Sequence, residues 1–245
     1  MIYFFIRRLT PEQNNANIAD IWMIINLINT DIIEKDNLIS GGAVNVCLYG
    51  SRWHNLIGMT NEETLDIFRQ TKALLEGHFI LRSGLHSRQY IQCALALQEM
   101  PVVEKLGAAL AEKLRGLNVR TVIAPAMGGL VIGQEVARQL GCRFIFAEKE
   151  NGKLVLRRGF KIAPGERMLV VEDVVTRGGR VAETIEIVKQ FGGEVAGVAM
   201  LVDRSDGKFT PGMPLYSLLK LNVETFEPTN LPEDLKALPA EHPGS

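Results

Sequence analysis

The sequence has 245 residues, of which 47% are hydrophobic and 22% are charged, proportions that are ordinary for a folded soluble protein. Its formal net charge is -1, so no overall basic field favours binding to nucleic acid. The three cysteines, Cys47, Cys93 and Cys142, are widely spaced and form no metal-binding or redox pair, which is typical of a reducing cytoplasm.

The apolar segments near the N-terminus do not predict export or membrane insertion. Arg7 and Arg8 follow the apolar residues 1–6, whereas a secretory signal carries its positive charge first. Residues 21–28 are also apolar, but they are far fewer than the roughly 20 residues that cross a bilayer. We therefore expect a cytoplasmic protein without a membrane partner.

The composition of the chain changes near Met59. Residues 1–58 contain eight Asn and eleven Ile, whereas residues 59–245 contain only five Asn. Two interpretations remain open: residues 1–58 form a small N-terminal extension, or translation naturally starts at Met59 and the upstream residues belong to an over-long reading frame. N-terminal sequencing of the native protein separates them, because an intact Met1 would contradict the late start.

From Met59 onward, the spacing of apolar residues predicts regular elements. Thr60 and the acidic residues after it are typical of a helix start, and the helical spacing continues over residues 62–75, with Gly77 as its stop. Two short strands are expected at 79–81 and 90–91. A helix follows at 102–114. Beyond it, the pattern predicts strands at 121–124, 144–147, 168–171, 195–202 and 215–221, and helices at 131–140 and 181–191.

Apolar strands that alternate with amphipathic helices indicate an α/β fold, with a parallel sheet covered by helices on both faces. We expect this domain to span residues 59–228 and a proline-containing tail with one short helical turn to span residues 229–245. Ligands bind such sheets at the carboxyl ends of the strands. The loops after Ala124, Val171 and Val202 are therefore the expected location of a site.

The segment from Met168 to Arg180 carries the most specific pattern in the chain. Gly178 and Gly179 allow a tight turn, and the helix start at Arg180 adds unpaired N–H groups and the positive end of a dipole. Together with the Thr176 hydroxyl, these groups suit a phosphate. The carboxylates of Glu172 and Asp173 would repel a phosphate, so they suit the hydroxyl groups of a ribose.

This segment resembles the phosphoribosyl pyrophosphate (PRPP) motif of the type I phosphoribosyltransferases, and the resemblance to the orotate enzymes among them extends over about residues 59–245. It implies their fold, an α/β sheet domain with a small N-terminal hood region. Arg177 and Arg180 stand where small hydroxyl residues are frequent in the family. The PRPP-binding residues that the resemblance implies are Glu172, Asp173, Val174, Val175, Thr176, Arg177, Gly178, Gly179, Arg180, Lys149 and Lys153.

Weaker matches indicate the orotate enzymes in particular. Arg82 lies in a segment similar to their substrate loop, at a position where lysine is common, and Arg204 follows a buried strand where the family binds the base. The resemblance implies that Thr176, Arg204 and Arg82 contact orotate. Residues 147–153 resemble the mobile catalytic loop, although a charged hairpin is the alternative, and Lys149 is expected directly after the strand end. Lys149 and Asp173 are the implied catalytic residues.

The implied reaction transfers the 5-phosphoribosyl group from PRPP to orotate, and gives orotidine 5′-phosphate and pyrophosphate. Mg²⁺ carried mainly by PRPP is the implied cofactor, and the family often forms homodimers. Two alternatives remain: a phosphoribosyltransferase for another base, and a regulatory protein that senses PRPP. The regulatory alternative usually requires a nucleic-acid-binding module, and residues 1–58 contain only Arg7, Arg8, Lys35 and Arg52 as cations.

Overall fold

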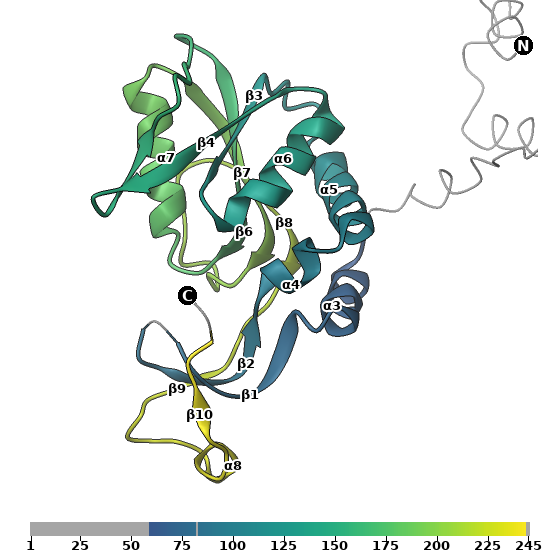
Figure 1. Cartoon of the computed structure of the whole chain (residues 1–245), viewed down its shortest axis with the longest axis vertical. Coiled ribbons are helices and arrows are strands. Elements are labelled where there is room, and N and C mark those ends of the chain that lie inside the picture. The colour runs from purple at the N-terminus through teal and green to yellow at the C-terminus, as the bar shows by residue number, and fades with distance from the viewer. Residues whose placement is uncertain (1–58, 82, 244–245) are drawn as a thin grey trace, which may run out of the picture. The chain divides into compact units, whose positions relative to one another are not determined.

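The computed structural model describes residues 59–81 and 83–243 (Figure 1). Residues 1–58, with both interpretations of that segment, and the predicted site residue Arg82 lie outside the described residues. In chain order the described elements are α3 (Asn61–Gln70), β1 (Leu74–Ile80), β2 (His86–Ile91), α4 (Cys93–Leu97), α5 (Met100–Leu114), β3 (Thr121–Pro125), α6 (Gly128–Leu140), β4 (Arg143–Glu150), β5 (Lys153–Leu156), β6 (Arg167–Val175), α7 (Gly179–Gln190), β7 (Glu194–Asp203), β8 (Leu215–Lys220), β9 (Thr225–Phe226), α8 (Glu233–Lys236) and β10 (Ala240–Glu241).

The main sheet has six strands in the spatial order β5-β4-β3-β6-β7-β8. Neighbouring strands from β4 to β8 pair in parallel, whereas β5 returns antiparallel along β4. Residues 168–171 of β6, at the centre of the sheet, are 0% exposed, as expected for an apolar strand that is covered on both faces. The predicted α/β fold with a mostly parallel sheet is confirmed.

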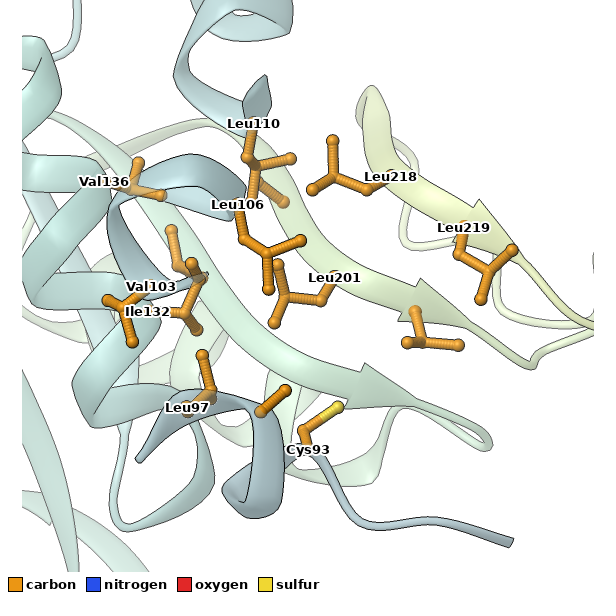
Figure 2. Close-up of a cluster of buried hydrophobic side chains, with 14 of the residues drawn as sticks. Cys93, Leu97, Val103, Leu106, Leu110, Ile132, Val136, Leu201, Leu218 and Leu219 are labelled. Carbon is orange, nitrogen blue, oxygen red and sulfur yellow. The ribbon is translucent and has the colours of Figure 1, made fainter. Parts of the chain in front are cut away.

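Helices cover both faces of this sheet (Figure 1). On one face, Val181, Ile185 and Val188 of α7 pack into a buried apolar cluster with β3, β6 and β7. On the other face, α5 and α6 pack against the same sheet, and Figure 2 shows Leu106 and Leu110 of α5 gathered near Leu201 of β7 and Leu218 of β8. Each face therefore has its own apolar core.

A second, four-stranded sheet has the order β10-β1-β2-β9. β1 and β2 form an antiparallel hairpin, and the C-terminal strands β9 and β10 add to its two edges. Arg88 of β2 donates to both carboxylate oxygens of Asp234 in α8, at 2.7 and 2.9 Å. The small hood region expected from the sequence thus contains strands from the C-terminal end as well as N-terminal ones, and residues 240–241 pair with β1.

The first described helix begins where the sequence predicts and ends earlier. Thr60 and Glu63 form a reciprocal capping box at its start. The expected continuation to residue 75 is wrong, because the chain turns at Lys72, whose φ is 56°, and the Ala73 N–H donates to the Phe68 carbonyl at 2.8 Å. This is the usual helix-ending pattern with lysine in the left-handed position in place of glycine, so the sequence offers no glycine stop there. Leu74 and Leu75 belong to β1.

Among residues 59–81 and 83–243, none of the helices combines the length and apolar character that crossing a bilayer requires.

We predict that Leu106→Ala lowers the free energy of unfolding by about 2–5 kcal/mol, because Leu106 is 0% exposed and its removal leaves a cavity between α5 and the sheet. Denaturant unfolding monitored by circular dichroism measures the change. Met100→Ala in the same helix is the control, because Met100 is 58% exposed, and it should change stability by about 0.5 kcal/mol or less. Equal losses in the two variants would contradict the packing described here.

Candidate functional site

The carboxyl end of β6 carries two adjacent carboxylates. The strand was expected to end at Val171, but parallel pairing with β7 continues to Val175, opposite Asp203, so Glu172 and Asp173 lie within the strand. The Asp173 N–H donates to Glu172 Oε1 at 3.1 Å, and the Val174 N–H donates to Asp173 Oδ1 at 2.7 Å. Backbone donors therefore hold both acidic side chains in place.

Glu172 is only 5% exposed. Burial, together with the neighbouring Asp173 carboxylate, raises the pKa of Glu172 to about 9. In the protein without ligand, Glu172 therefore favours its protonated form at neutral pH. A protonated Glu172 can donate a hydrogen bond and Asp173 can accept one, so the pair suits a ligand with several hydroxyl groups.

The loop after β6 leads directly into α7. Gly178 is the N-cap residue of α7 and has a φ of 72°, and Phe209 packs against its Cα. The backbone N–H groups of residues 176–180 donate to no other protein group within the described part of the chain. Unpaired N–H groups at the start of a twelve-residue helix can bind an anion, so these residues are called the cradle below, and phosphate binding there stays a prediction. Of the two glycines, Gly178 alone has a positive φ, because Gly179 already belongs to the helix.

A second loop approaches this acid pair from β3. A methyl group on Gly128 would lie 2.8 Å from Asp173 Oδ1, and one on Gly129 would lie 2.8 Å from the Val171 carbonyl oxygen and 3.1 Å from Glu172 Oε1. The start of α6 can therefore approach the end of β6 only because both residues are glycine. Arg180 of α7 completes the contact, because its Nη1 donates to the Ala126 carbonyl at 3.3 Å.

The segment expected to be a mobile loop forms a β-hairpin in the structure. Lys149 was expected after a strand end, but it lies inside β4, opposite Leu154 of β5, because strand pairing continues to Glu150 and Lys153. Arg157 and Arg158 bind acidic side chains of β4, with Arg158 Nη2 2.8 Å from Glu148 Oε2. Lys149 and Lys153 are exposed and make no ion pair with any described residue, so their charges are available to a ligand.

Arg204 follows β7, one residue beyond Asp203. Its backbone N–H donates to the Val175 carbonyl at 2.8 Å, which holds it beside the end of β6. Burial lowers the pKa of Arg204, and its Nε is buried without a hydrogen-bond partner among the described residues. A buried, unpaired guanidinium N–H costs free energy unless a ligand accepts from it.

Cys93 and Tyr90 lie near this guanidinium. Burial, reinforced by Asp173 and Glu172, raises the pKa of the Cys93 thiol, so this thiol stays protonated. The sequence patterns do not connect Cys93 or Phe209 with the site. Neither residue belongs to a motif, and only the folded chain brings them close.

The structure therefore brings together the acid pair, the cradle at residues 176–180 and Arg204 at the carboxyl ends of β6 and β7. Lys149 and Lys153 are carried on the β4–β5 hairpin, at the carboxyl end of β4. Arg82 lies outside the described residues. Within the described residues, no group of three or more His, Cys, Asp or Glu side chains is arranged to hold a metal ion.

The chain is similar to known proteins of one family. The family model for the phosphoribosyl transferase domain matches residues 94–234. The orotate phosphoribosyltransferase of Desulforamulus reducens is 54% identical over 187 residues, which cover 76% of this chain and 98% of that protein.

Among solved structures, the orotate phosphoribosyltransferase of Aeropyrum pernix aligns with a TM-score of 0.56 at 26% identity, covering 64% of this chain and 92% of that one. The adenine phosphoribosyltransferase of Thermoanaerobacter pseudethanolicus aligns with a TM-score of 0.50 at 22% identity, covering 54% and 88%. Since the fold is shared by enzymes named for different bases, the fold alone does not identify the base.

We predict that Gly178→Ala destabilises the protein by about 1–3 kcal/mol and weakens binding of inorganic phosphate, because the new methyl group would lie 2.1 Å from Phe209 Cδ2 in a backbone with positive φ. Thermal unfolding and phosphate titration measure the two effects. Gly179→Ala is the matched control, because nothing lies within 4 Å of its added methyl group. Similar behaviour of the two variants would show that the Gly178–Phe209 contact does not shape the loop.

The stability of the protein is expected to depend on pH through Glu172. The folded protein holds a proton on Glu172 up to about pH 9, whereas an unfolded glutamate releases it near its ordinary value of 4.5. Folding therefore takes up a proton between these values, and the contribution of Glu172 to stability, complete below about pH 4.5, is lost as the pH rises towards about 9.

Glu172→Gln should flatten the decline of unfolding free energy between about pH 5 and about pH 9, because glutamine does not titrate. Denaturant unfolding at a series of pH values measures the slope. The exposed Glu186→Gln in α7 is the control and should keep the slope of the unmodified protein. If Glu172→Gln also keeps that slope, Glu172 is not protonated in the folded state.

Proposed function

The chain belongs to the orotate phosphoribosyltransferases, and we propose from its site that it transfers the 5-phosphoribosyl group of PRPP to orotate in pyrimidine biosynthesis. The products are orotidine 5′-phosphate and pyrophosphate. One observation carries the assignment of the site: an unpaired N–H cradle, an acid pair and a buried, unpaired arginine meet at the carboxyl ends of two adjacent parallel strands. These groups match a phosphate, a ribose and an anionic base in turn.

The 5-phosphate of PRPP is assigned to residues 176–180. The free N–H groups and the dipole of α7 attract its negative charge, and the exposed hydroxyl of Thr176 adds a donor. Arg177 and Arg180 add positive charge at the rim. The Arg180 side chain also donates to Ala126, so its role includes holding the β3 loop beside the cradle.

The ribose hydroxyls are assigned to Glu172 and Asp173. Asp173 can accept a hydrogen bond from a ribose hydroxyl, and a carboxylate at this position favours the positive character that C1 of the ribose gains as pyrophosphate leaves. Glu172 is largely neutral before PRPP binds, because burial raises its pKa to about 9. Keeping one of two adjacent carboxyls neutral limits their repulsion of the phosphates.

The base is assigned to Arg204, with Thr176 and Arg82 as further contacts. The carboxylate of orotate offers two acceptor oxygens in the geometry of a guanidinium fork. The buried Nε of Arg204 has no hydrogen-bond partner among residues 59–81 and 83–243, so a carboxylate would replace the hydrogen bond that burial removes. Uracil, which lacks this carboxylate, would leave the guanidinium unpaired.

The leaving pyrophosphate is assigned to Lys149 and Lys153 together with the β3 loop. Both lysines are exposed on the β4–β5 hairpin and free of ion pairs with described residues, so they can reach a ligand without breaking an existing contact. Their charge offsets the charge that develops on pyrophosphate. Closure of the hairpin over PRPP would exclude water and suppress hydrolysis.

Mg²⁺ is proposed as the cofactor, carried mainly by PRPP. The oxygen donors of Glu172 and Asp173 are of the type that Mg²⁺ prefers, and no larger cluster of ligands occurs among the described residues. The chemistry that Mg²⁺ supplies when bound is partial neutralisation of the leaving pyrophosphate.

We also propose a homodimer in the cytoplasm, with residues 59–228 as the transferase domain, residues 229–245 as its tail and residues 1–58 as an extension outside it. The domain proposal draws support from the relatives, which align over 187 residues of this chain. Light scattering coupled to size-exclusion chromatography tests the dimer.

A panel of orotate, uracil, adenine and hypoxanthine, each incubated with PRPP and Mg²⁺, tests the function. Release of pyrophosphate with orotate alone is expected. Product from another base but not from orotate would favour the alternative phosphoribosyltransferase, and binding of PRPP without turnover of any base would favour the PRPP-sensing alternative.

We predict that Asp173→Asn lowers kcat by about a hundredfold with the fold intact, because it removes the charge that favours the transition state. Steady-state kinetics with orotate and PRPP measure kcat, and circular dichroism checks the fold. Asp66→Asn, on the exposed side of α3, is the matched control and should retain the kcat of the unmodified protein. Near-normal turnover of Asp173→Asn would remove the assigned role.

We further predict that Arg204→Ala raises the KM for orotate by about tenfold or more and changes the KM for PRPP much less. Arg204→Lys should recover only part of the loss, because lysine keeps the charge but lacks the planar fork. Both constants come from initial rates at varied concentrations of each substrate. Equal effects of Arg204→Ala on the two substrates would contradict the assignment of Arg204 to orotate.

A further inference from the structure

A cavity of about 540 Å³ lies at the opposite edge of the main sheet from the candidate site. Arg120, Arg143 and residues 161–166 line this opposite-edge cavity. Arg120 directly precedes β3 and Arg143 is the first residue of β4, so the cavity adjoins the amino ends of the strands. The nine residues of β6 separate the two edges by about 25 Å at a rise of about 3.3 Å per residue. The two sites therefore do not overlap.

The lining of the opposite-edge cavity is positively charged. Three cations, Arg120, Arg143 and Lys161, face one acid, Glu166. Although burial alone would raise the pKa of Glu166, hydrogen bonds from Thr121 and the Ala163 N–H, with the charge of Arg143, lower it below its ordinary value. Glu166 is thus ionised and already satisfied by protein donors, so the excess charge of the cavity is positive.

Arg143 is held in place before any ligand binds. Its Nε donates to Thr121 Oγ1 at 2.9 Å, and its Nη2 donates to the Lys161 carbonyl at 2.8 Å and to Glu166 Oε1 at 2.9 Å. Its Nη1 makes no hydrogen bond or ion pair with a described residue. A fixed guanidinium with an unused donor loses little conformational freedom when an anion binds.

Arg120 and Lys161 add flexible charges at the same cavity. Both are exposed, and neither forms an ion pair with a residue in the described part of the chain. The turn after Lys161 supplies apolar surface from Ile162, Ala163 and Pro164. Cations beside an apolar wall suit an organic molecule that carries a phosphate, and about 540 Å³ is within the usual size of small-molecule sites.

From this geometry we propose that the opposite-edge cavity is a second ligand site, which binds the phosphate group of a small phosphate monoester through Arg120, Arg143 and Lys161. The organic part of the ligand lies against Ile162 and Pro164. Because the opposite-edge cavity adjoins the first residues of β3, β4 and β6, a ligand there contacts the same strands whose other ends carry the transferase site. The proposal does not depend on the transferase reaction.

Residue-resolved NMR of the full-length protein labelled with ¹⁵N tests the proposal, with inorganic phosphate and ribose 5-phosphate as separate probes. Saturable shifts of the Ala163 and Gly165 amide signals are expected with both probes, and tighter binding is expected for ribose 5-phosphate. The Gly179 amide reports the transferase site in the same spectra, so occupancy of the two sites is measured separately.

Arg120→Gln combined with Lys161→Gln should weaken binding at Ala163 and Gly165 by about tenfold or more and leave the Gly179 response unchanged. Lys113→Gln combined with Arg115→Gln, which removes two cations around the end of α5, is the matched control and should leave both responses unchanged. The absence of saturable shifts at Ala163 and Gly165, an undiminished response in the first double variant, or an equal response to chloride at the same ionic strength would overturn the proposal. If ribose 5-phosphate binds no tighter than inorganic phosphate, the monoester assignment is wrong.

Discussion

Two carboxyl groups on consecutive residues of a central parallel strand repel each other, and that of Glu172 is also buried; the candidate site is arranged around that constraint. The pKa of Glu172, raised to about 9, relieves the repulsion by keeping one proton on the pair. Backbone N–H groups donate to both side chains. Arg204 lies close by, and its buried Nε has no hydrogen-bond partner among the described residues. A ribose ligand with a phosphate on one side and an anionic base on the other satisfies all of these groups together.

Glycine makes this arrangement possible at two loops. Gly128 and Gly129 let the start of α6 approach the acid pair, where a methyl group would collide with carboxylate or backbone oxygen. Gly178 turns the chain into α7 while Phe209 packs against it. These three glycines are required because they lack a side chain. An alanine at any of them is therefore expected to disturb the site without removing a functional group.

Sequence patterns predicted the parallel sheet, its flanking helices and the phosphate cradle, because alternation of apolar segments and a glycine-containing loop are local properties. They failed where local signals are ambiguous. Leu74 and Leu75 fit a helix and a strand equally well, and the chain leaves the helix at a lysine, which carries no stop signal. Lys149 was expected after a strand because the apolar segment ends at Ala147, but pairing with β5 extends β4 past it.

The sequence by itself determined that residues 168–180 contain a strand, an acidic pair and a glycine-containing helix start that suit a ribose phosphate, since each feature depends on neighbouring residues. Only the tertiary structure decided which further groups complete the site, because Cys93 and Phe209 approach it through packing and not through any motif. The same holds for the opposite-edge cavity, in which Thr121 and Glu166 fix Arg143, residues that lie 22 and 23 positions from it in the chain. Contacts at such separations leave no periodic trace in a sequence, and they appear only when strand order and register are known.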